Sequence, residues 1–252
     1  MLIRVSKRKL FTTIILFNML FSRDDLISQL DAVKEQRSYF SMNISPDKAT
    51  IALTNSNYTS LDLIGIKGSI AVDIPHINSF QCKWSPNSEK LLLMRSNYER
   101  KRRQNGLIVI NNMGNINHTV IELTNQKIYP IGWTGDNTFH YLLDEELITQ
   151  NIKGSKNEWD MPLIFSIKNK LYKKTNDSDA LLLYEANDMI LDLSYSSNAE
   201  LIVFEVYGDK TIIIQNSETI IDDIQNGNAP KISPDGNTVS YTHLRAHETS
   251  AY

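Results

Sequence analysis

The feature of this chain that most constrains its fold is a short motif that recurs five times. In each copy a large apolar residue precedes Ser-Pro-Asp, Ser-Pro-Asn or a degenerate form, and an apolar run follows within a few residues. Proline at the second position of a turn sets φ to about −65°, and Asp or Asn bonds its own main chain and tolerates left-handed backbone. The motif therefore predicts a tight turn that leads into a strand. The copies are Ser45-Pro46-Asp47, Ser85-Pro86-Asn87, Thr134-Gly135-Asp136, Ser196-Ser197-Asn198 and Ser233-Pro234-Asp235-Gly236.

The spacing of the motif predicts a repeat of about 40 residues, with further strands between the copies. Motif starts at positions 45, 85, 134, 196 and 233 give intervals of 40, 49, 62 and 37 residues. Apolar runs bounded by turn residues fill these intervals, at about four strands per interval, which is typical of a β-propeller blade. No helical period separates the strands, so a parallel α/β fold is disfavoured. Examples of these runs are Ser60–Ile66, Ser69–Ile74, Lys210–Gln215 and Glu218–Ile224.

The longest interval is irregular. It holds two loop-like segments, Lys153–Asn157 and Thr175–Asp179, with a predicted strand pair over Met161–Tyr172 between them. Either one blade is enlarged here or a degenerate blade is embedded, and the pattern leaves both readings open.

The Ser-Pro-Asp-Gly copy at 233–236, with Ser45-Pro46-Asp47 and Trp84-Ser85-Pro86-Asn87, resembles the repeat of TolB-like β-propellers. The same repeat builds the propeller of prolyl-oligopeptidase-type peptidases. The resemblance spans about residues 39–240 and implies an exported six- to eight-bladed propeller that binds a protein or ligand on one face. We expect an all-β fold: an incomplete propeller of about four to five blades of four-stranded antiparallel sheets, with a short N-terminal helix.

The N-terminus has the pattern of an export signal over residues 1–22. Four cations precede an uncharged apolar run from Leu10 to Phe21, which is too short for a comfortable transmembrane span. Leu20-Phe21-Ser22 is a poor cleavage site, so an uncleaved membrane anchor is the alternative. The cations are Arg4, Lys7, Arg8 and Lys9.

The segments that flank the repeats have separate interpretations. Residues 23–38 are predicted to form a linker helix, because apolar residues recur there at helical spacing. So short a linker leaves no room for the N-terminal α/β domain of TolB, and a role in the Tol–Pal system does not carry over. Residues 241–252 resemble translated sequencing-adapter DNA and are predicted to be non-native. We therefore discount the His243/His247 spacing as a metal site, and we expect further sequence to follow in the native gene, because an open propeller leaves two sheet edges unpaired.

Composition and charge exclude several function classes. Apolar residues make up 41% of the 252 and charged residues 22%, as in ordinary globular proteins. Residues 23–240 carry a net charge of about −7, which argues against nucleic-acid binding. Cys82 is the single cysteine, so neither an intrachain disulfide nor a CxxC metal site can form, and we expect a small buried core residue beside Trp84.

Motifs for catalysis are absent from the sequence. There is no Gly-x-Ser-x-Gly elbow, no P-loop and no Gly-x-Gly-x-x-Gly. His76, His118 and His140 are isolated and are predicted to be loop or strand residues. We therefore predict no catalytic residue, no cofactor and no metal.

One charge run stands out, at Arg100, Lys101, Arg102 and Arg103, directly after Glu99. We expect it in a loop between strands over Leu91–Met94 and Leu107–Ile110. It is either a solvated hairpin loop or a site that docks an acidic partner or anionic surface.

Two function classes remain. The first, which we favour, is a non-enzymatic extracytoplasmic binding module for a protein or small ligand, periplasmic, cell-surface or secreted, with membrane contact only through an uncleaved N-terminus. The second is the propeller of a prolyl-oligopeptidase-like serine peptidase whose catalytic domain is missing from this sequence. The 62-residue interval and the short N-terminus match no peptidase pattern.

Overall fold

The computed structural model describes most of the predicted repeat region. The described residues are 39–55, 60–65, 68–72, 77–152, 154–176, 178–196, 200–207, 210–215, 219–225, 227–233 and 236–243. The predicted export signal, the predicted linker helix and residues 244–252 of the predicted tail lie outside them.

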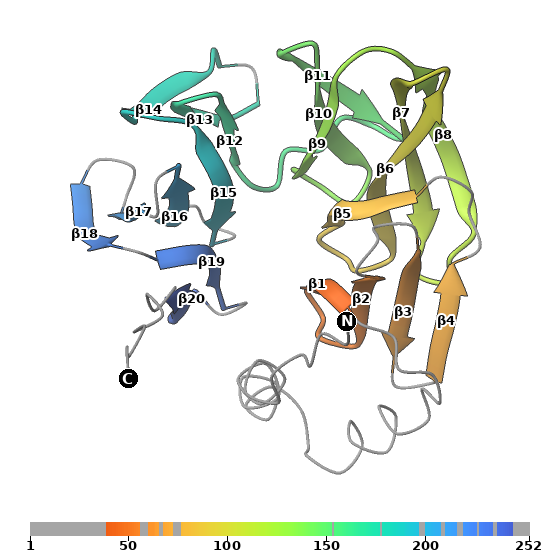
Figure 1. Cartoon of the computed structure of the whole chain (residues 1–252), viewed down its shortest axis with the longest axis horizontal. Coiled ribbons are helices and arrows are strands. Elements are labelled where there is room, and N and C mark those ends of the chain that lie inside the picture. Colours follow the sequence, from red (N-terminus) through yellow and green to blue (C-terminus); the bar gives the residue numbers. More distant parts are fainter. Residues whose placement is uncertain are drawn as a thin grey trace, which may run out of the picture. The chain divides into compact units, whose positions relative to one another are not determined.

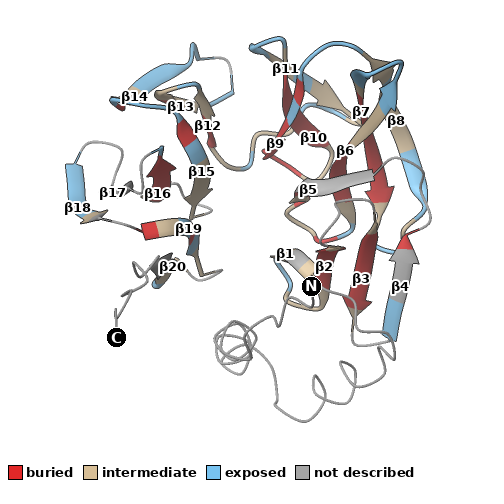
Figure 2. Ribbon diagram, viewed as in Figure 1, coloured by how far each residue is buried: buried red, intermediate tan, exposed pale blue. Residues whose placement is uncertain are grey.

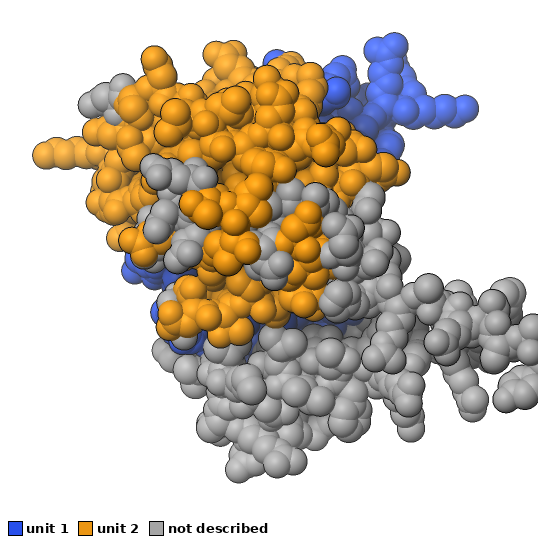
Figure 3. Space-filling view, turned by 90° about the vertical axis from the view of Figure 1, so that its left-hand side faces the viewer, with its two compact units in different colours: residues 1–130 blue, residues 131–252 orange. Residues whose placement is uncertain are grey.

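The described part of the chain is built from twenty strands in six antiparallel sheets (Figure 1). Strands that are adjacent in sequence are adjacent in their sheet, so each sheet is an up-and-down meander of consecutive strands. The described residues contain no helix that is long and apolar enough to cross a membrane. The chain divides into two compact units at residue 130, shown in Figure 3, and each is described by itself.

The first unit contains two four-stranded sheets. The first sheet has the order β1-β2-β3-β4 and the second β5-β6-β7-β8. Their strands are β1 (Tyr39–Ile44), β2 (Thr50–Asn55), β3 (Leu61–Gly65), β4 (Gly68–Val72), β5 (Ile77–Trp84), β6 (Lys90–Glu99), β7 (Arg102–Asn111) and β8 (Ile116–Thr124).

The second unit contains the remaining strands, except that β9 crosses the division. Its sheets are β9-β10-β11, β12-β13-β14, β15-β16-β17-β18 and β19-β20. The strands are β9 (Ile128–Trp133), β10 (Thr138–Leu143), β11 (Glu146–Asn151), β12 (Leu163–Ile167), β13 (Lys170–Lys174), β14 (Leu181–Glu185), β15 (Ile190–Tyr195), β16 (Leu201–Val206), β17 (Lys210–Gln215), β18 (Thr219–Gln225), β19 (Gly227–Ile232) and β20 (Val239–His243). Residues 241–243 of the predicted tail thus lie in β20.

The core of the first unit lies between its two sheets, where Figure 2 shows the buried strands. Side chains of a strand alternate between its faces, so Leu91 and Leu93 of β6 point one way with Ile108 and Ile110 of β7. These four side chains pack against buried residues of the first sheet. Cys82 is buried in the same cluster, as predicted from the sequence.

The core of the second unit joins the sheet β12-β13-β14 to the sheet β15-β16-β17-β18. Ile164 and Leu171 from the first of these pack with Ile202 and Phe204 from the second. The ring of Tyr184 lies 5.4 Å from that of Phe204, in a tilted arrangement. Apolar contacts between the faces of successive sheets are what a propeller requires.

The structure resolves the irregular 62-residue interval. The interval from Thr134 to Ser196 covers β10 to β15, and these strands belong to three separate sheets rather than to one enlarged sheet: β9-β10-β11, β12-β13-β14 and β15-β16-β17-β18. The strand pair predicted over Met161–Tyr172 is present as β12 and β13, with Leu163 paired to Lys174 and Ile167 to Lys170.

The Ser-Pro-Asp and Ser-Pro-Asn motifs form tight turns between the first and second strands of their sheets. In the first copy, the Ser45 hydroxyl donates to Asp47 and accepts from the Thr50 amide, and the Asp47 carboxylate accepts from the Ala49 amide.

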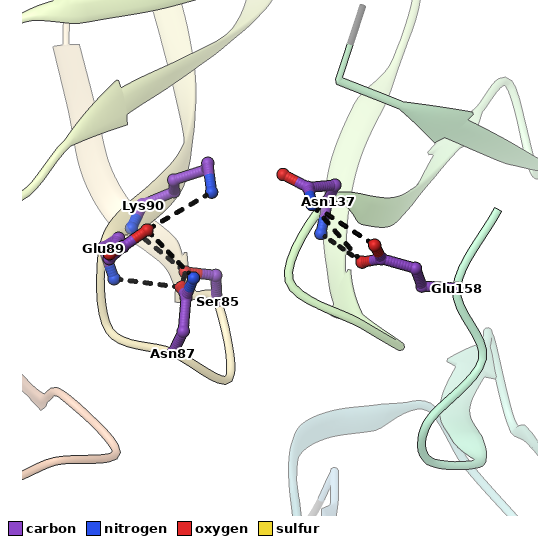
Figure 4. A network of polar contacts seen from close by, with 6 residues as sticks. All are labelled: Ser85, Asn87, Glu89, Lys90, Asn137 and Glu158. Atoms are coloured by element: carbon purple, nitrogen blue, oxygen red, sulfur yellow. Dashed lines mark hydrogen bonds and ion pairs between the residues drawn. The ribbon is translucent and has the colours of Figure 1, made fainter. Parts of the chain in front are cut away.

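In the second copy, Ser85 makes the equivalent bonds to Asn87 and Lys90, drawn in Figure 4. The prediction that these residues form turns is confirmed.

The left-handed position in these turns directly follows the Asp or Asn, where the last copy of the motif has Gly236. Lys48, with a φ of 63°, and Ser88, also at 63°, adopt it, and Gly236 adopts it in the last copy at 74°. Asp47 and Asn87 have no positive φ, and their side chains accept the amide two residues on.

Candidate functional site: a basic hairpin arm

The predicted charge run lies at the end of a long hairpin and not in an open loop. Strands β6 and β7 pair without interruption from Lys90–Asn111 to Glu99–Arg102, and only Arg100 and Lys101 form the turn. The expected loop between Met94 and Leu107 is therefore wrong. Polar residues continue the strand ladder beyond the apolar core, and such residues give no hydrophobic signal from which a strand could be predicted.

The outer part of this hairpin extends beyond its neighbours in the sheet. β5 pairs with β6 only as far as Arg95, and β8 pairs with β7 only from Asn105 inward. Residues 97–104 pair with one another alone, and we call them the arm. Figure 2 shows its turn end as exposed.

The tip of the arm has left-handed backbone at both central positions. Arg100 has a φ of 47° and Lys101 a φ of 68°. This is the geometry of a two-residue hairpin turn, for which Asn-Gly is preferred because other residues resist positive φ. The turn at Asp144 and Glu145 also has charged residues with φ of 50° and 76°, so this chain tolerates the strain more than once.

The four cations of the charge run are all exposed. The Arg103 guanidinium donates to the Ser96 hydroxyl at 3.1 Å, and the Glu99 carboxylate accepts from the Gln104 amide at 3.1 Å. Within the described ranges, none of the four cations forms an ion pair. Tyr98, which is paired with Arg103 across the strands, is 71% exposed. The arm therefore presents positive charge and one aromatic ring to solvent.

The base of the arm is held by side-chain hydrogen bonds on one face. Ser96 and Asn105 are cross-strand partners whose side chains lie 3.2 Å apart, and the Asn105 amide donates to the Gln126 carbonyl at 2.9 Å. These bonds order the point where the arm leaves the sheet.

The opposite face of the hairpin contains a cation that the sequence pattern did not single out. Arg95 is half-buried at the base of the arm, opposite Gly106, and its Nε is buried without a hydrogen-bond partner. Gly106 is required here by space, because a Cβ would lie 2.9 Å from the Ile121 carbonyl oxygen. In the sequence, Arg95 is a single cation that directly follows the apolar run Leu91–Met94, and nothing in that pattern indicates a binding residue.

The histidines are placed as the sequence predicted where the structure describes them. His118 lies in β8 and His140 in β10, while His76 lies outside the described residues. Among the described residues, no cluster of His, Cys, Asp or Glu could hold a metal ion.

His140 is fully buried in a polar network of the second unit. Its Nε2 lies 2.8 Å from the Thr134 hydroxyl and its Nδ1 lies 3.0 Å from the Thr149 hydroxyl. The ring also contacts Trp159, with centroids 4.7 Å apart. Burial, and secondarily the charge of Lys174, lowers the pKa of His140 to about 4, so the ring is neutral near pH 7.

The same network holds the connector between β11 and β12. The Glu158 carboxylate accepts from the Asn137 amide at 2.9 Å, as drawn in Figure 4, and the Glu158 amide donates to the Thr138 hydroxyl at 2.7 Å. The hydrogen-bonding side chains of His140, Thr134, Thr138 and Glu158 have partners within the protein, whereas Nε1 of Trp159 is buried without one. The arrangement therefore fits a structural clamp, and the exposed arm is the stronger candidate for recognition.

Comparison with known proteins gives similarity at the level of the fold. No protein-family model matches this chain. No curated protein matches it either.

Several solved structures are similar. A protein assigned as TolB from Agrobacterium tumefaciens has 14% identity and a TM-score of 0.56, over 83% of this chain and 92% of that one. TolB from Acinetobacter baumannii has 14% identity and a TM-score of 0.51, over 83% of this chain and 49% of that one.

A prolyl endopeptidase structure has 11% identity and a TM-score of 0.50, over 81% of this chain and 42% of that one. Together with the successive antiparallel sheets, these similarities establish the architecture. The fold is a TolB-like β-propeller. At these identities the likeness concerns the fold alone.

Proposed function

We propose that this chain is a non-enzymatic binding module that recognises a protein or a small ligand outside the cytoplasm. The observation that carries the proposal is the basic arm, an ordered and exposed element with four consecutive cations and no ion pair within the described residues. Loops and hairpins at the ends of a rigid scaffold are where binding residues concentrate.

The charge of the arm favours an acidic partner. Opposite charges steer encounter and fix orientation, and exposed cations retain this effect at distances of about 8–10 Å at physiological ionic strength. Nucleic acid is disfavoured as the partner, because residues 23–240 have a net charge of about −7.

Export is proposed from the N-terminal pattern of four cations followed by an apolar run. A fusion of residues 1–38 to a reporter that is active only outside the cytoplasm tests it. Reporter activity supports a periplasmic, surface or secreted protein, whereas an intact fusion protein that shows no reporter activity would exclude one.

Capture from extracts of the source cells tests the binding function. The full chain is compared with the charge-reversal variant R100E/K101E and with the control K127E/K156E, whose two lysines are also exposed. We expect one or more acidic proteins to be retained by the wild type and the control but lost with the arm variant. Equal retention by all three proteins would contradict the arm as the binding element.

The alternative is the propeller of a prolyl-oligopeptidase-like serine peptidase, and the similarity to the prolyl endopeptidase structure favours it. Sequencing of the native gene through and beyond the codon for Ser240 distinguishes the peptidase propeller from the binding module. A following domain with a Gly-x-Ser-x-Gly elbow supports the peptidase, and further blades before a stop codon support the binding module.

A further inference from the structure

One face of the β6–β7 hairpin aligns two arginines along its length. The uninterrupted register places Arg95 and Arg102 on the same face, because Arg95 is opposite Gly106, Asn97 opposite Gln104 and Glu99 opposite Arg102. We call residues 95, 97, 99, 102 and 104 the Arg95 face. Four strand positions separate the levels of the two arginines, which corresponds to about 13 Å along the arm.

Arg95 is the residue on this face that most requires a ligand. Its Nε is buried and has no hydrogen-bond partner, and the residue forms no ion pair within the described ranges. A buried donor without a partner is costly, and an arginine is a strong donor to carboxylate groups. The hairpin from Arg95 to Arg103 contains five cations and one carboxylate, Glu99, which accepts a hydrogen bond from Gln104.

The depth of Arg95 decides which kind of acidic partner fits. A flat anionic surface, such as a membrane, meets the tip residues Arg100 and Lys101 but not a half-buried side chain that lies about 13 Å below the level of Arg102. An extended peptide that lies along the arm meets both levels. Its side chains alternate, so carboxylates at positions i and i+4 point to one side at this same spacing.

We propose that the Arg95 face binds an extended acidic segment of a partner protein, with one carboxylate on Arg95 and a second on Arg102. This rests on the proposed binding function and names the chemistry of the partner. Arg103 lies on the opposite face, where its guanidinium donates to Ser96, so it makes no direct contact with this segment.

The test uses the full chain and a fluorescein-labelled synthetic peptide in which Glu alternates with Ser. Fluorescence anisotropy at low ionic strength measures the dissociation constant for the wild type, R95Q, R102Q and the control R103Q. We expect R95Q and R102Q each to weaken binding about tenfold and R103Q less than about threefold, because loss of a direct charge-assisted bond costs more than loss of a distant charge. A peptide with Gln in place of Glu should not bind.

A parallel measurement uses vesicles that contain phosphatidylserine. The proposal expects vesicle binding, if it occurs, to depend on R100Q/K101Q and not on R95Q. Failure of the wild type to bind the Glu peptide, or equal effects of R95Q and R103Q, would overturn the proposal. Should R95Q not fold, R102Q against R103Q decides, since both lie in the arm beyond the packed core.

The outcome is separable from that of the proposed function. If the Glu peptide fails to bind but R100E/K101E still abolishes partner capture, the arm is the binding element and the peptide chemistry is wrong. If the peptide binds through Arg95 but capture is unaffected by the arm, the binding module is assigned to the wrong surface.

Discussion

The buried ring of His140 donates a hydrogen bond to Thr134. The Thr134 hydroxyl itself donates to the Glu158 carbonyl at 2.9 Å, so it can only accept from Nε2 of His140, 2.8 Å away. The Nδ1 atom then accepts from Thr149. This tautomer is neutral, and it joins the β9–β10 turn, β11 and the connector that leads to β12.

Stability should fall as the pH drops from about 6.5 to about 4. The pKa of His140 is about 4 in the folded chain against 6.5 as its ordinary value, so the unfolded chain binds the proton first. The contribution of neutral His140 to the free energy of unfolding is complete above pH 6.5. It is lost as the pH falls toward 4, and the total loss is about 3 kcal/mol at most. Urea unfolding at several pH values measures this, and H140Q should flatten the dependence between pH 4 and 6.5. An unchanged pH dependence in H140Q would contradict this role.

G135A should destabilise the second unit. A Cβ at Gly135 would overlap the Cβ of Glu158, so the connector must shift and its hydrogen bonds to Asn137 and Thr138 must lengthen. We expect a loss of about 1–3 kcal/mol in the free energy of unfolding. G65A is the matched control, because its Cβ would meet only ordinary contacts from 3.4 Å, and it should cost less than about 1 kcal/mol. Equal losses in the two variants would argue against the clamp.

K48G should stabilise the first unit. Lys48 has a φ of 63°, in the position that glycine occupies in the last copy of the motif, where Gly236 has a φ of 74°. Replacing Lys48 by glycine removes left-handed backbone strain of about 1–2 kcal/mol. It also adds an entropy cost of about 0.5–1 kcal/mol, because glycine has more conformational freedom in the unfolded chain. We expect a small rise in melting temperature for K48G, and a fall for K90G, which places glycine inside β6. A fall for both would show that the turn gains nothing from glycine.

Charge reversal in the arm should leave the fold intact. R100E/K101E changes exposed residues at the end of a hairpin that extends beyond β5 and β8, so the free energy of unfolding should change by less than about 0.5 kcal/mol. L93A removes a side chain that is 0% exposed and should cost about 2–5 kcal/mol. Chemical denaturation measures both. A large loss in R100E/K101E would mean that the arm serves the fold.

Local patterns in the sequence predicted those parts of the fold that depend on local chemistry. Each Ser-Pro-Asp or Ser-Pro-Asn turn forms from hydrogen bonds within six residues, and the following apolar run forms the buried strand, as at Ser85 and Leu91–Met94. The burial of Cys82 followed in the same way from its place beside Trp84.

The remaining features depend on contacts that no local pattern encodes. Thr134 and Glu158 are 24 residues apart, and their hydrogen bond arises from a connector that crosses the β9–β10 turn. The arm pairs polar residues with polar residues, and the role of Arg95 depends on its register with Gly106 across the hairpin. A repeat pattern also could not divide the long interval, since the sheet β12-β13-β14 within it has no copy of the motif between its first two strands.

The most direct test of the arm as the binding element is site-specific photocrosslinking in the source cells. A photoreactive phenylalanine analogue replaces Tyr98 in the arm, which is 71% exposed, or Tyr207 after β16, which is 64% exposed and serves as the control. We expect a discrete crosslinked protein from position 98 that disappears when R100E/K101E is added, and none from position 207. Crosslinks of the same protein from both positions, or from position 207 alone, would contradict the account.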